Sequence, residues 1–224
     1  DYPLRDVYKR QSLSCDAGVP AAVWQAMVGR AVERSFNAIT VDGDTSTNDT
    51  VLAFAAGDPL APEHFAALEA GLTAVARHLA RAVARDGEGA TCLIEVSVEG
   101  AASEAGARAI ARTVCGSSLV KTAVHGRDPN WGRIVAAAGR AGVAFDPAAV
   151  ALWLGEHQLM AAGQPLGFDR AAASGYMQER ATGPYLTDDT VAIRLRVGEG
   201  PGAGIAWGCD LSDQYVRINA DYTT

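Results

Sequence analysis

The sequence predicts a mixed fold of the α/β or α+β class, in which helices and strands alternate from one end of the chain to the other. Three observations support this class. Apolar residues recur at helical spacing in some segments, they alternate with polar residues in others, and clusters of turn-forming residues separate the segments. The chain has 224 residues, of which 49% are apolar and 20% charged, so it can bury a sizeable core in one large or two small domains.

Helix-start signals place most of the predicted helices. Pro20 and Pro62 suit the first turn of a helix, and Ser103 and Ser212 are residues that favour the N-cap position. Gly175 interrupts the apolar spacing of one helix and weakens that prediction. Helices are expected at residues 20–36, 62–85, 103–114, 134–140, 169–179 and 212–218.

The strand predicted from residue 91 to residue 99 has the clearest alternation. Its apolar positions Cys92, Ile94, Val96 and Val98 recur at every second residue, which is the period of a strand. Further strands are expected at residues 39–41, 119–125, 191–197 and 204–210, and a hairpin at 150–154 and 158–161 across Gly155-Glu156.

A polar loop of nine residues, 42–50, follows the short predicted strand 39–41 and consists almost entirely of Asp, Thr, Ser, Asn and Gly. Such side chains bond their own backbone in turns, and Thr47 or Asn48 would cap a helix that begins with Val51–Phe54. The alternating oxygen-bearing residues also suit a calcium loop, although the glycine and the distal glutamate of an EF-hand are missing. The loop is therefore a capped turn, a calcium loop or part of a substrate pocket.

Charge and cysteine usage exclude several classes of function. The net charge of −7, without a run of Lys or Arg, argues against nucleic acid or an anionic membrane as a partner. We see no apolar stretch long enough for a membrane span and no signal peptide, so we expect a cytoplasmic protein. The sequence contains no Cys-x-x-Cys pair, so a zinc site is not expected. We expect buried free thiols at Cys15, Cys92, Cys115 and Cys209.

The first eleven residues do not match the rest of the chain. The segment 6–11 can be back-translated to the end of a transposase-type sequencing adaptor, so we expect residues 1–11 to be a read artefact or a disordered tail. A genuine charged N-terminal tail is the alternative. After residue 11 we predict a main α/β part at 12–115 and a smaller α/β part at 116–197. A C-terminal strand and helix at 198–224 are predicted to return to the site.

Four polar segments interrupt the apolar elements, at residues 42–50, 86–91, 128–133 and 219–224. If they converge, they form a pocket that suits a small zwitterion such as an amino acid. In that pocket Glu88 would bind an ammonium group, while Asn219 and Thr224 would bind carboxylate or amide groups. The histidines are scattered in the sequence and predict no catalytic triad: His64, His78, His125 and His157.

Five segments resemble, in the same order, the motifs of the ornithine acetyltransferase family of arginine biosynthesis, which are bifunctional glutamate N-acetyltransferases. The first motif reads Ser-Phe-Asn-x-Ile-Thr-Val-Asp-Gly-Asp-Thr-Ser-Thr-Asn-Asp-Thr. The third contains His-Gly-x-Asp-Pro-Asn-Trp-Gly-Arg. The five segments are residues 35–50, 86–91, 119–133, 207–211 and 218–222, and the resemblance covers residues 16–224.

The resemblance implies a precursor that cuts itself before a threonine, which then opens a second chain and carries the acyl group. This sequence is similar to that second chain. Aligning the Asp-Ala of the family pattern on Asp16-Ala17 places the nucleophile at Tyr8, and Cys15 stands where the pattern has threonine. No catalytic residue is therefore expected in this chain. An N-terminal threonine needs no histidine, because its own α-amino group is a nearby base.

The implied reaction moves an acetyl group from N-acetylornithine to glutamate, and some family members also accept acetyl-CoA. No cofactor is implied. Glu88, Asn219 and Thr224 match substrate-binding positions of the family. The residues that the resemblance suggests shape the site are Asp42, Asp44, Thr45, Thr47 and Asn48.

The resemblance also implies a layered α-β-β-α arrangement with a smaller second α/β domain, and an α2β2 heterotetramer with the first chain of the same precursor. Two other functions stay open at this point. One is a related amidase or peptidase with an N-terminal nucleophile and water as acceptor. The other is a non-catalytic module that binds calcium or an amino acid through the loop 42–50.

Overall fold

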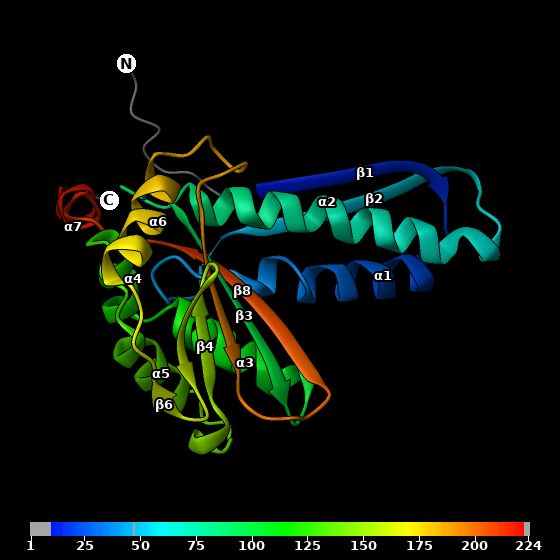
Figure 1. The fold of residues 1–224 in the computed structure, drawn as a ribbon. Coiled ribbons are helices and arrows are strands. Elements are labelled where there is room, and N and C mark those ends of the chain that lie inside the picture. The colour runs from blue at the N-terminus through cyan, green and yellow to red at the C-terminus, as the bar shows by residue number, and fades with distance from the viewer. Residues whose placement is uncertain (1–9, 47, 222–224) are drawn as a thin grey trace. The chain divides into compact units, whose positions relative to one another are not determined.

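The computed structural model describes residues 10–46 and 48–221, and it divides the chain into two compact units (Figure 1). Within the described residues, the first unit runs to Asn37 and includes Asp44–Leu79, and the second consists of Ala38–Gly43 and everything from Ala80 onward. Each unit has its own sheet and its own core. This division differs from the domain boundaries expected at 115 and 197.

The first unit combines two parallel strands with helices. Strands β1 (Arg10–Gly18) and β2 (Thr50–Pro59) run parallel. Helix α1 (Ala21–Glu33) and the part of α2 (Phe65–Arg85) that belongs to this unit supply the helical layer, with a short 3-10 turn at Pro62–His64 ahead of α2. Their apolar faces meet in a core whose buried members are Met27, Ala31, Leu72 and Ala76.

Strand β2 is where the prediction of a capped helix at Val51–Phe54 is wrong. Its side chains alternate between half-buried and exposed, and Leu52 and Phe54 are 50% and 56% exposed. A short apolar run does not by itself distinguish helix from strand. Pairing with β1 decides the outcome, because the hydrogen bonds of a parallel ladder come from a segment distant in sequence.

Strand β1 begins inside the segment expected to be an artefact or a disordered tail. Arg10 and Gln11 pair with Thr50 and Val51, so these two residues are part of the sheet. The rest of that segment, residues 1–9, lies outside the described residues.

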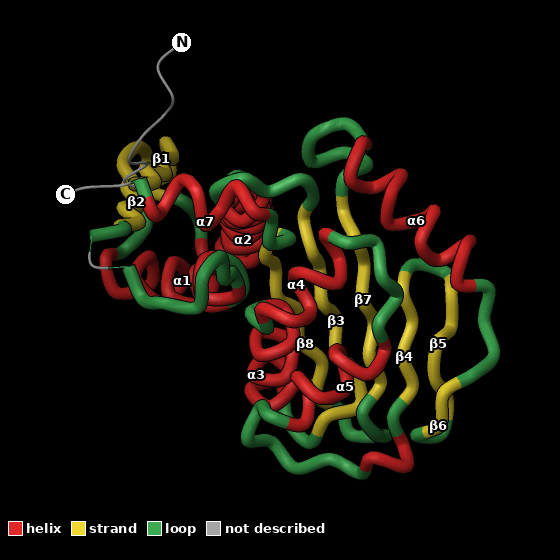
Figure 2. Tube along the Cα trace, turned by 90° about the vertical axis from the view of Figure 1, so that its left-hand side faces the viewer, coloured by secondary structure: helices red, strands yellow, loops and turns green. Residues whose placement is uncertain are grey.

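The second unit is built on a six-stranded mixed sheet with the order β6-β5-β4-β7-β3-β8 (Figure 2). Strand β3 is parallel to β7 and antiparallel to β8. The predicted hairpin is confirmed, and Gly155 in its turn has φ +56°, which glycine adopts readily. The strands are β3 (Leu93–Ala101), β4 (Ala151–Leu154), β5 (His157–Ala161), β6 (Gln164–Pro165), β7 (Thr190–Arg196) and β8 (Gly202–Cys209).

Helices α3, α4 and α5 cover one face of this sheet, the face toward the viewer in Figure 2. The Ser103 cap is confirmed, because its hydroxyl accepts a hydrogen bond from the Gly106 N–H at 3.1 Å. Gly175 does not interrupt its helix. No helix within the described residues is both long and apolar enough to cross a bilayer. The helices of this unit are α3 (Glu104–Cys115), α4 (Ser118–His125), α5 (Trp131–Gly139), α6 (Arg170–Thr182) and α7 (Asp213–Ala220), with a 3-10 turn at Pro147–Ala149. A further 3-10 turn, Phe36–Ala38, spans the point where the chain passes from the first unit to the second.

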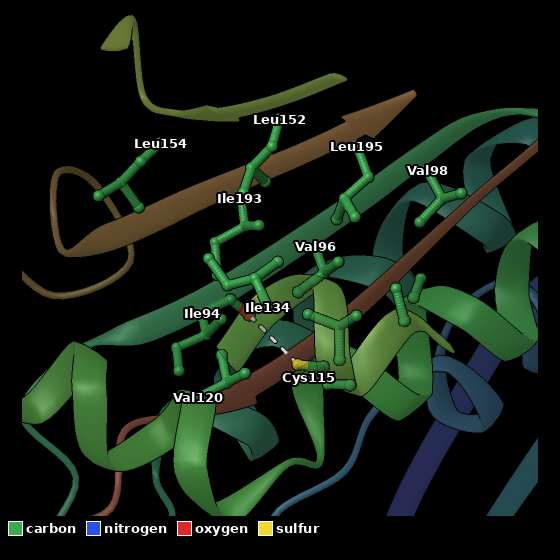
Figure 3. Packing of buried hydrophobic residues seen from close by; sticks show 14 of the residues in the cluster. Ile94, Val96, Val98, Cys115, Val120, Ile134, Leu152, Leu154, Ile193 and Leu195 are labelled. Atoms are coloured by element: carbon green, nitrogen blue, oxygen red, sulfur yellow. Dashed lines mark hydrogen bonds between the residues drawn. The ribbon is translucent and has the colours of Figure 1, made fainter. Parts of the chain in front are cut away.

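The core of the second unit lies between the sheet and these helices (Figure 3). The alternation predicted for β3 is confirmed, because Ile94, Val96 and Val98 are buried on the face that the helices cover. Val96 lies opposite Ile193 of β7 in the sheet. Each such side chain contributes roughly 1.5–3 kcal/mol when it leaves water, so this face of the sheet fixes the position of the loops at its ends.

Two strand predictions in this unit are wrong. The segment 119–125 forms α4, in which Val120, Ala123 and Val124 are buried and Leu119 is exposed. This is the spacing of a helix face, which the β-branched residues obscured. The segment 39–41 forms no strand, and only Ile39 makes an isolated bridge to β8.

Candidate functional site

The loop 86–91 joins α2 to β3 and carries Glu88, the residue expected to bind the substrate amine. Gly87 before it is buried, and a Cβ there would lie 2.5 Å from Cys209 Sγ. Gly89 after it has φ +69°, a conformation that costs glycine little. The two glycines let the backbone pack closely against the unit and leave the Glu88 side chain exposed.

Arg85 holds the end of this loop from the last turn of α2. Its Nε lies 2.5 Å from Oδ2 of Asp189, which is fully buried. Its two remaining nitrogens donate to the carbonyl oxygens of Ala90 and Thr91 at 3.1 and 3.0 Å. One planar guanidinium therefore joins a buried carboxylate to two successive residues of the loop.

Asp210 holds the same end of the loop from the residue after β8, and it is only 1% exposed. Its Oδ1 accepts hydrogen bonds from the backbone N–H groups of Thr91 and Cys92 at 2.7 and 3.1 Å. Its Oδ2 accepts from the Thr91 hydroxyl at 2.7 Å and lies 2.7 Å from Nδ1 of His125. An ionised carboxylate only accepts, so we assign the Nδ1 proton to His125.

The pKa of Asp210 lies below its ordinary value. Burial by itself would raise it, but the hydrogen bonds from Thr91 and His125 and from the backbone of Thr91 and Cys92 outweigh burial. Asp210 is therefore ionised at neutral pH and binds the end of the loop as a charged acceptor.

The C-terminal end of α4 brings the motif at 125–133 to the same place. Arg127 has φ +56° and donates to the Thr91 hydroxyl at 3.1 Å and to the Val124 carbonyl at 2.7 Å. The residue just before the polar segment 128–133 thus contacts the polar segment 86–91. The rest of this motif has a structural role, because the Asn130 side chain caps α5 by accepting from the Arg133 N–H at 3.1 Å.

Helix α7 also starts beside the loop. Ser212 precedes it and donates from its hydroxyl to the Gly89 carbonyl at 2.8 Å, instead of capping α7 as predicted. A Cβ on Gly89 would lie 2.5 Å from Cβ of Gln214, so the two backbones are in close contact. Asn219 is exposed further along α7, where its side chain donates to the Tyr215 carbonyl at 2.9 Å.

The segment Ala38–Gly43 packs against the loop from another direction. A Cβ on Gly87 would lie 3.1 Å from Cγ1 of Val41. The ammonium group of Lys121, a residue only 3% exposed, donates to the Val41 carbonyl. A buried lysine is costly unless hydrogen-bonded, so this contact ties the segment to α4.

The residues expected to shape or contact the site fall into three groups. Asp42 is exposed and lies within the segment Ala38–Gly43. Asp44, Thr45 and Asn48 are exposed in the first unit, where the loop is held by the Ser46 hydroxyl, which accepts from the Asp49 N–H at 3.1 Å. Three of the predicted positions lie outside the described residues, namely Tyr8, Thr47 and Thr224.

The cysteines are free thiols, and Cys92, Cys115 and Cys209 are buried as expected. The prediction is wrong for Cys15, which is only partly buried. Burial raises the pKa of Cys92 to about 12 and also raises that of Cys115. Neither supplies a thiolate nucleophile at neutral pH. The described residues contain no group of three or more His, Cys, Asp and Glu side chains that could hold a metal ion.

Sequence reasoning missed the groups that hold the loop. No local pattern assigns a role to Asp210, His125 or Arg85. Thr91 is the shared partner of Arg85 and Asp210, and Asp210 lies far from it in sequence, as does His125, whose partner is Asp210. The one available signal is that Asp210 and His125 occur in the same ordered set of motifs.

A model of the ArgJ family matches residues 11–224. The chain is 74% identical over 212 residues to the arginine biosynthesis bifunctional protein ArgJ of Prochlorococcus marinus (strain MIT 9313), with 95% of this chain and 50% of the relative covered. It is 71% identical to the protein of that name from Parasynechococcus marenigrum (strain WH8102), with 94% and 49% covered.

The fold is similar to the crystal structure of the arginine biosynthesis bifunctional protein ArgJ from Bacillus halodurans. The TM-score is 0.88 at 39% sequence identity, with 95% of this chain and 99% of that chain covered. This likeness confirms the mixed α/β class. The chain spans about half the length of the curated relatives it matches. With a family model matched over nearly its whole length, the chain belongs to the ArgJ family.

Proposed function

We propose that this chain is the second chain of an acyltransferase that moves acetyl from N-acetylornithine to glutamate. Membership of the ArgJ family supports the reaction. The structural observation that best supports this function is that three segments with family motifs contact one another at the loop 86–91. There Thr91 forms hydrogen bonds with Asp210 and Arg127. These contacts hold the backbone beside Glu88, the group proposed to bind the substrate amine.

The proposed chemistry is a two-step transfer through an N-terminal threonine. Its hydroxyl attacks the acetyl carbonyl of N-acetylornithine, an ester forms, the amide C–N bond breaks, and ornithine leaves with the proton. The amino group of glutamate then attacks the ester, which gives N-acetylglutamate and restores the hydroxyl. Preorganised donors for the oxyanion are proposed to come from the other half of the protein. No cofactor enters these steps, and acetyl-CoA is proposed as a second acyl donor.

The residues of this chain bind and orient the substrates. The Glu88 carboxylate is proposed to bind the ammonium group of N-acetylornithine, while Asn219 and Thr224 bind its other polar ends. For Asn219 this requires its side chain to exchange the Tyr215 carbonyl for the substrate. The residues proposed to shape the site are Asp42, Asp44, Thr45, Thr47 and Asn48.

The proposed partner is the first chain of the same precursor, in an α2β2 assembly in the cytoplasm. Two large apolar side chains of β2, Leu52 and Phe54, are 50% and 56% exposed, which suits burial against a second protein surface. The length of the relatives, about twice that of this chain, supports a further half.

The test of this function is acetyl transfer by the complete gene product. The upstream gene is recovered, the whole precursor is expressed, and N-acetylglutamate is measured after N-acetylornithine and glutamate are supplied. We expect cleavage before a threonine at the position of Tyr8 and glutamate-dependent transfer. Release of acetate without glutamate would indicate the hydrolase instead, and no turnover of either kind would reject an enzymatic role.

Replacing Glu88 with alanine in the complete enzyme is expected to lower kcat/KM for N-acetylornithine by about 10- to 100-fold, because a charge-assisted hydrogen bond contributes roughly 1.5–3 kcal/mol. Stability should change little, since the side chain is exposed. Glu156→Ala, in the exposed β4–β5 turn, is the matched control and should keep wild-type kinetics. Unchanged kinetics for Glu88→Ala would remove Glu88 from the site.

A further inference from the structure

A hollow of about 320 Å³ lies on the second unit at the C-terminal end of α3. Three separate segments line it: the segment Ala38–Gly43, the last turns of α3, and the residue that follows α5. None of the lining residues belongs to the loop 86–91 or to the groups that hold it. They are Thr40, Gly43, Ala109, Arg112, Thr113, Gly116 and Arg140.

The lining is cationic, although the chain as a whole has a net charge of −7. Arg112 and Arg140 line the hollow from different elements, and no Asp or Glu lines it. Within the described residues neither is paired with a carboxylate, whereas Arg108, one turn earlier on α3, pairs with Glu104 at 2.7 Å. Two like charges at one hollow favour an anion between them.

Carbonyl oxygens without a hydrogen-bond donor at the C-terminal end of α3 would repel an anion. Two of these carbonyl groups, however, accept hydrogen bonds. The Arg112 carbonyl accepts from the Gly116 N–H at 2.9 Å, and the Val114 carbonyl accepts from the Ser117 N–H at 3.2 Å. Thr40 adds a further hydroxyl to the lining. Because the Thr113 hydroxyl already donates to the Ala109 carbonyl at 2.8 Å, Arg112 and Arg140 are the charged donors of the lining.

The size and shape of the hollow select the anion. A Cβ on Gly116 would lie 3.2 Å from the Arg112 carbonyl oxygen and 3.4 Å from the Thr40 hydroxyl, so Gly116 and Thr40 are close neighbours in this wall. A volume of 320 Å³ is at the lower end of the range of about 300–1,000 Å³ for ligand pockets. A tetrahedral phosphate offers oxygens to donors that approach from different elements, whereas a carboxylate offers two in one plane.

We propose that the hollow binds phosphate, either as the free ion or as the phosphate group of a small metabolite, between Arg112 and Arg140. The bound anion also holds the segment Ala38–Gly43, because two residues of that segment form one wall. Phosphate binding would therefore affect the loop that carries Glu88, because Val41 of this segment contacts that loop. The coupling to Glu88 rests on the proposed function, whereas the proposal that phosphate binds here does not.

The test is calorimetric titration of the full-length protein that carries this chain, at constant ionic strength, with inorganic phosphate, glycerol 3-phosphate and acetate as probes. We expect either phosphate compound to bind at least about 10-fold more tightly than acetate. Tighter binding of the free ion assigns an inorganic phosphate site, and tighter binding of glycerol 3-phosphate assigns a phosphomonoester site. Equal affinity for acetate overturns the proposal.

Arg112→Gln and Arg140→Gln should each weaken phosphate binding by at least about 10-fold, because each removes a charge-assisted hydrogen bond. Both side chains belong to exposed residues, so the variants should fold. Arg108→Gln on the same helix is the matched control and should bind as the wild type does. No phosphate binding by the wild type, or an equal loss in Arg108→Gln, would overturn the assignment. The measurement needs no acetyl transfer, so it stands apart from the test of the proposed function.

Discussion

Replacing Asp210 with alanine is expected to lower the free energy of unfolding by about 3–5 kcal/mol, as removal of one partner from a buried charged network does. The substitution leaves two backbone N–H groups, at Thr91 and Cys92, without their acceptor in a buried place. It also leaves the Nδ1 proton of His125 without a carboxylate. Urea unfolding of the full-length protein measures the change.

Asp213→Ala is the matched control, because Asp213 is exposed at the start of α7, three residues further along, and should change stability by less than about 0.5 kcal/mol. The pH dependence gives a second readout. The folded-state pKa of Asp210 is depressed, so its contribution is present above the ordinary carboxyl pKa of about 3.9 and is lost as the pH falls through the folded-state value. Asp210→Ala should therefore lose less stability on acidification than the wild type. An equal acid dependence would contradict this account.

Replacing Arg85 with methionine is expected to cost a similar amount, about 3–5 kcal/mol, because it leaves the fully buried carboxylate of Asp189 without its partner. The variant also frees the carbonyl groups of Ala90 and Thr91. The loop that carries Glu88 should therefore move more, and hydrogen exchange of its amides should quicken. Unfolding measurements and exchange on the same sample test both effects.

The double variant Arg85→Met with Asp189→Asn separates charge from packing. Asparagine keeps an oxygen for the Leu186 N–H, which Asp189 accepts at 2.9 Å, but carries no charge. The free energy of unfolding should return most of the way to the wild-type value, because no buried charge is left unpaired. The loop amides should still exchange faster than in the wild type, because the guanidinium group is still missing. A double variant as unstable as Arg85→Met would show that the buried charge is not the cause.

Elements with local signals were predictable from the sequence. Pro20 and Pro62 precede α1 and α2, and Ser103 caps α3, because such signals act within one turn of a helix. The alternation in β3 predicted its buried face for the same reason. Strand β2 and helix α4 were predicted wrongly, because short apolar runs satisfy both periods. For β2, pairing with β1 resolves the ambiguity.

The sequence by itself determined the family motifs, the mixed α/β class and the loop on which Glu88 lies, since these depend on residue type and on order along the chain. Only the tertiary structure decided how that loop is held. Thr91 is joined to Arg85, Arg127 and Asp210, the last of them 119 positions away. No local pattern encodes such a contact, because its energy depends on burial and on a partner that only folding brings within hydrogen-bond distance.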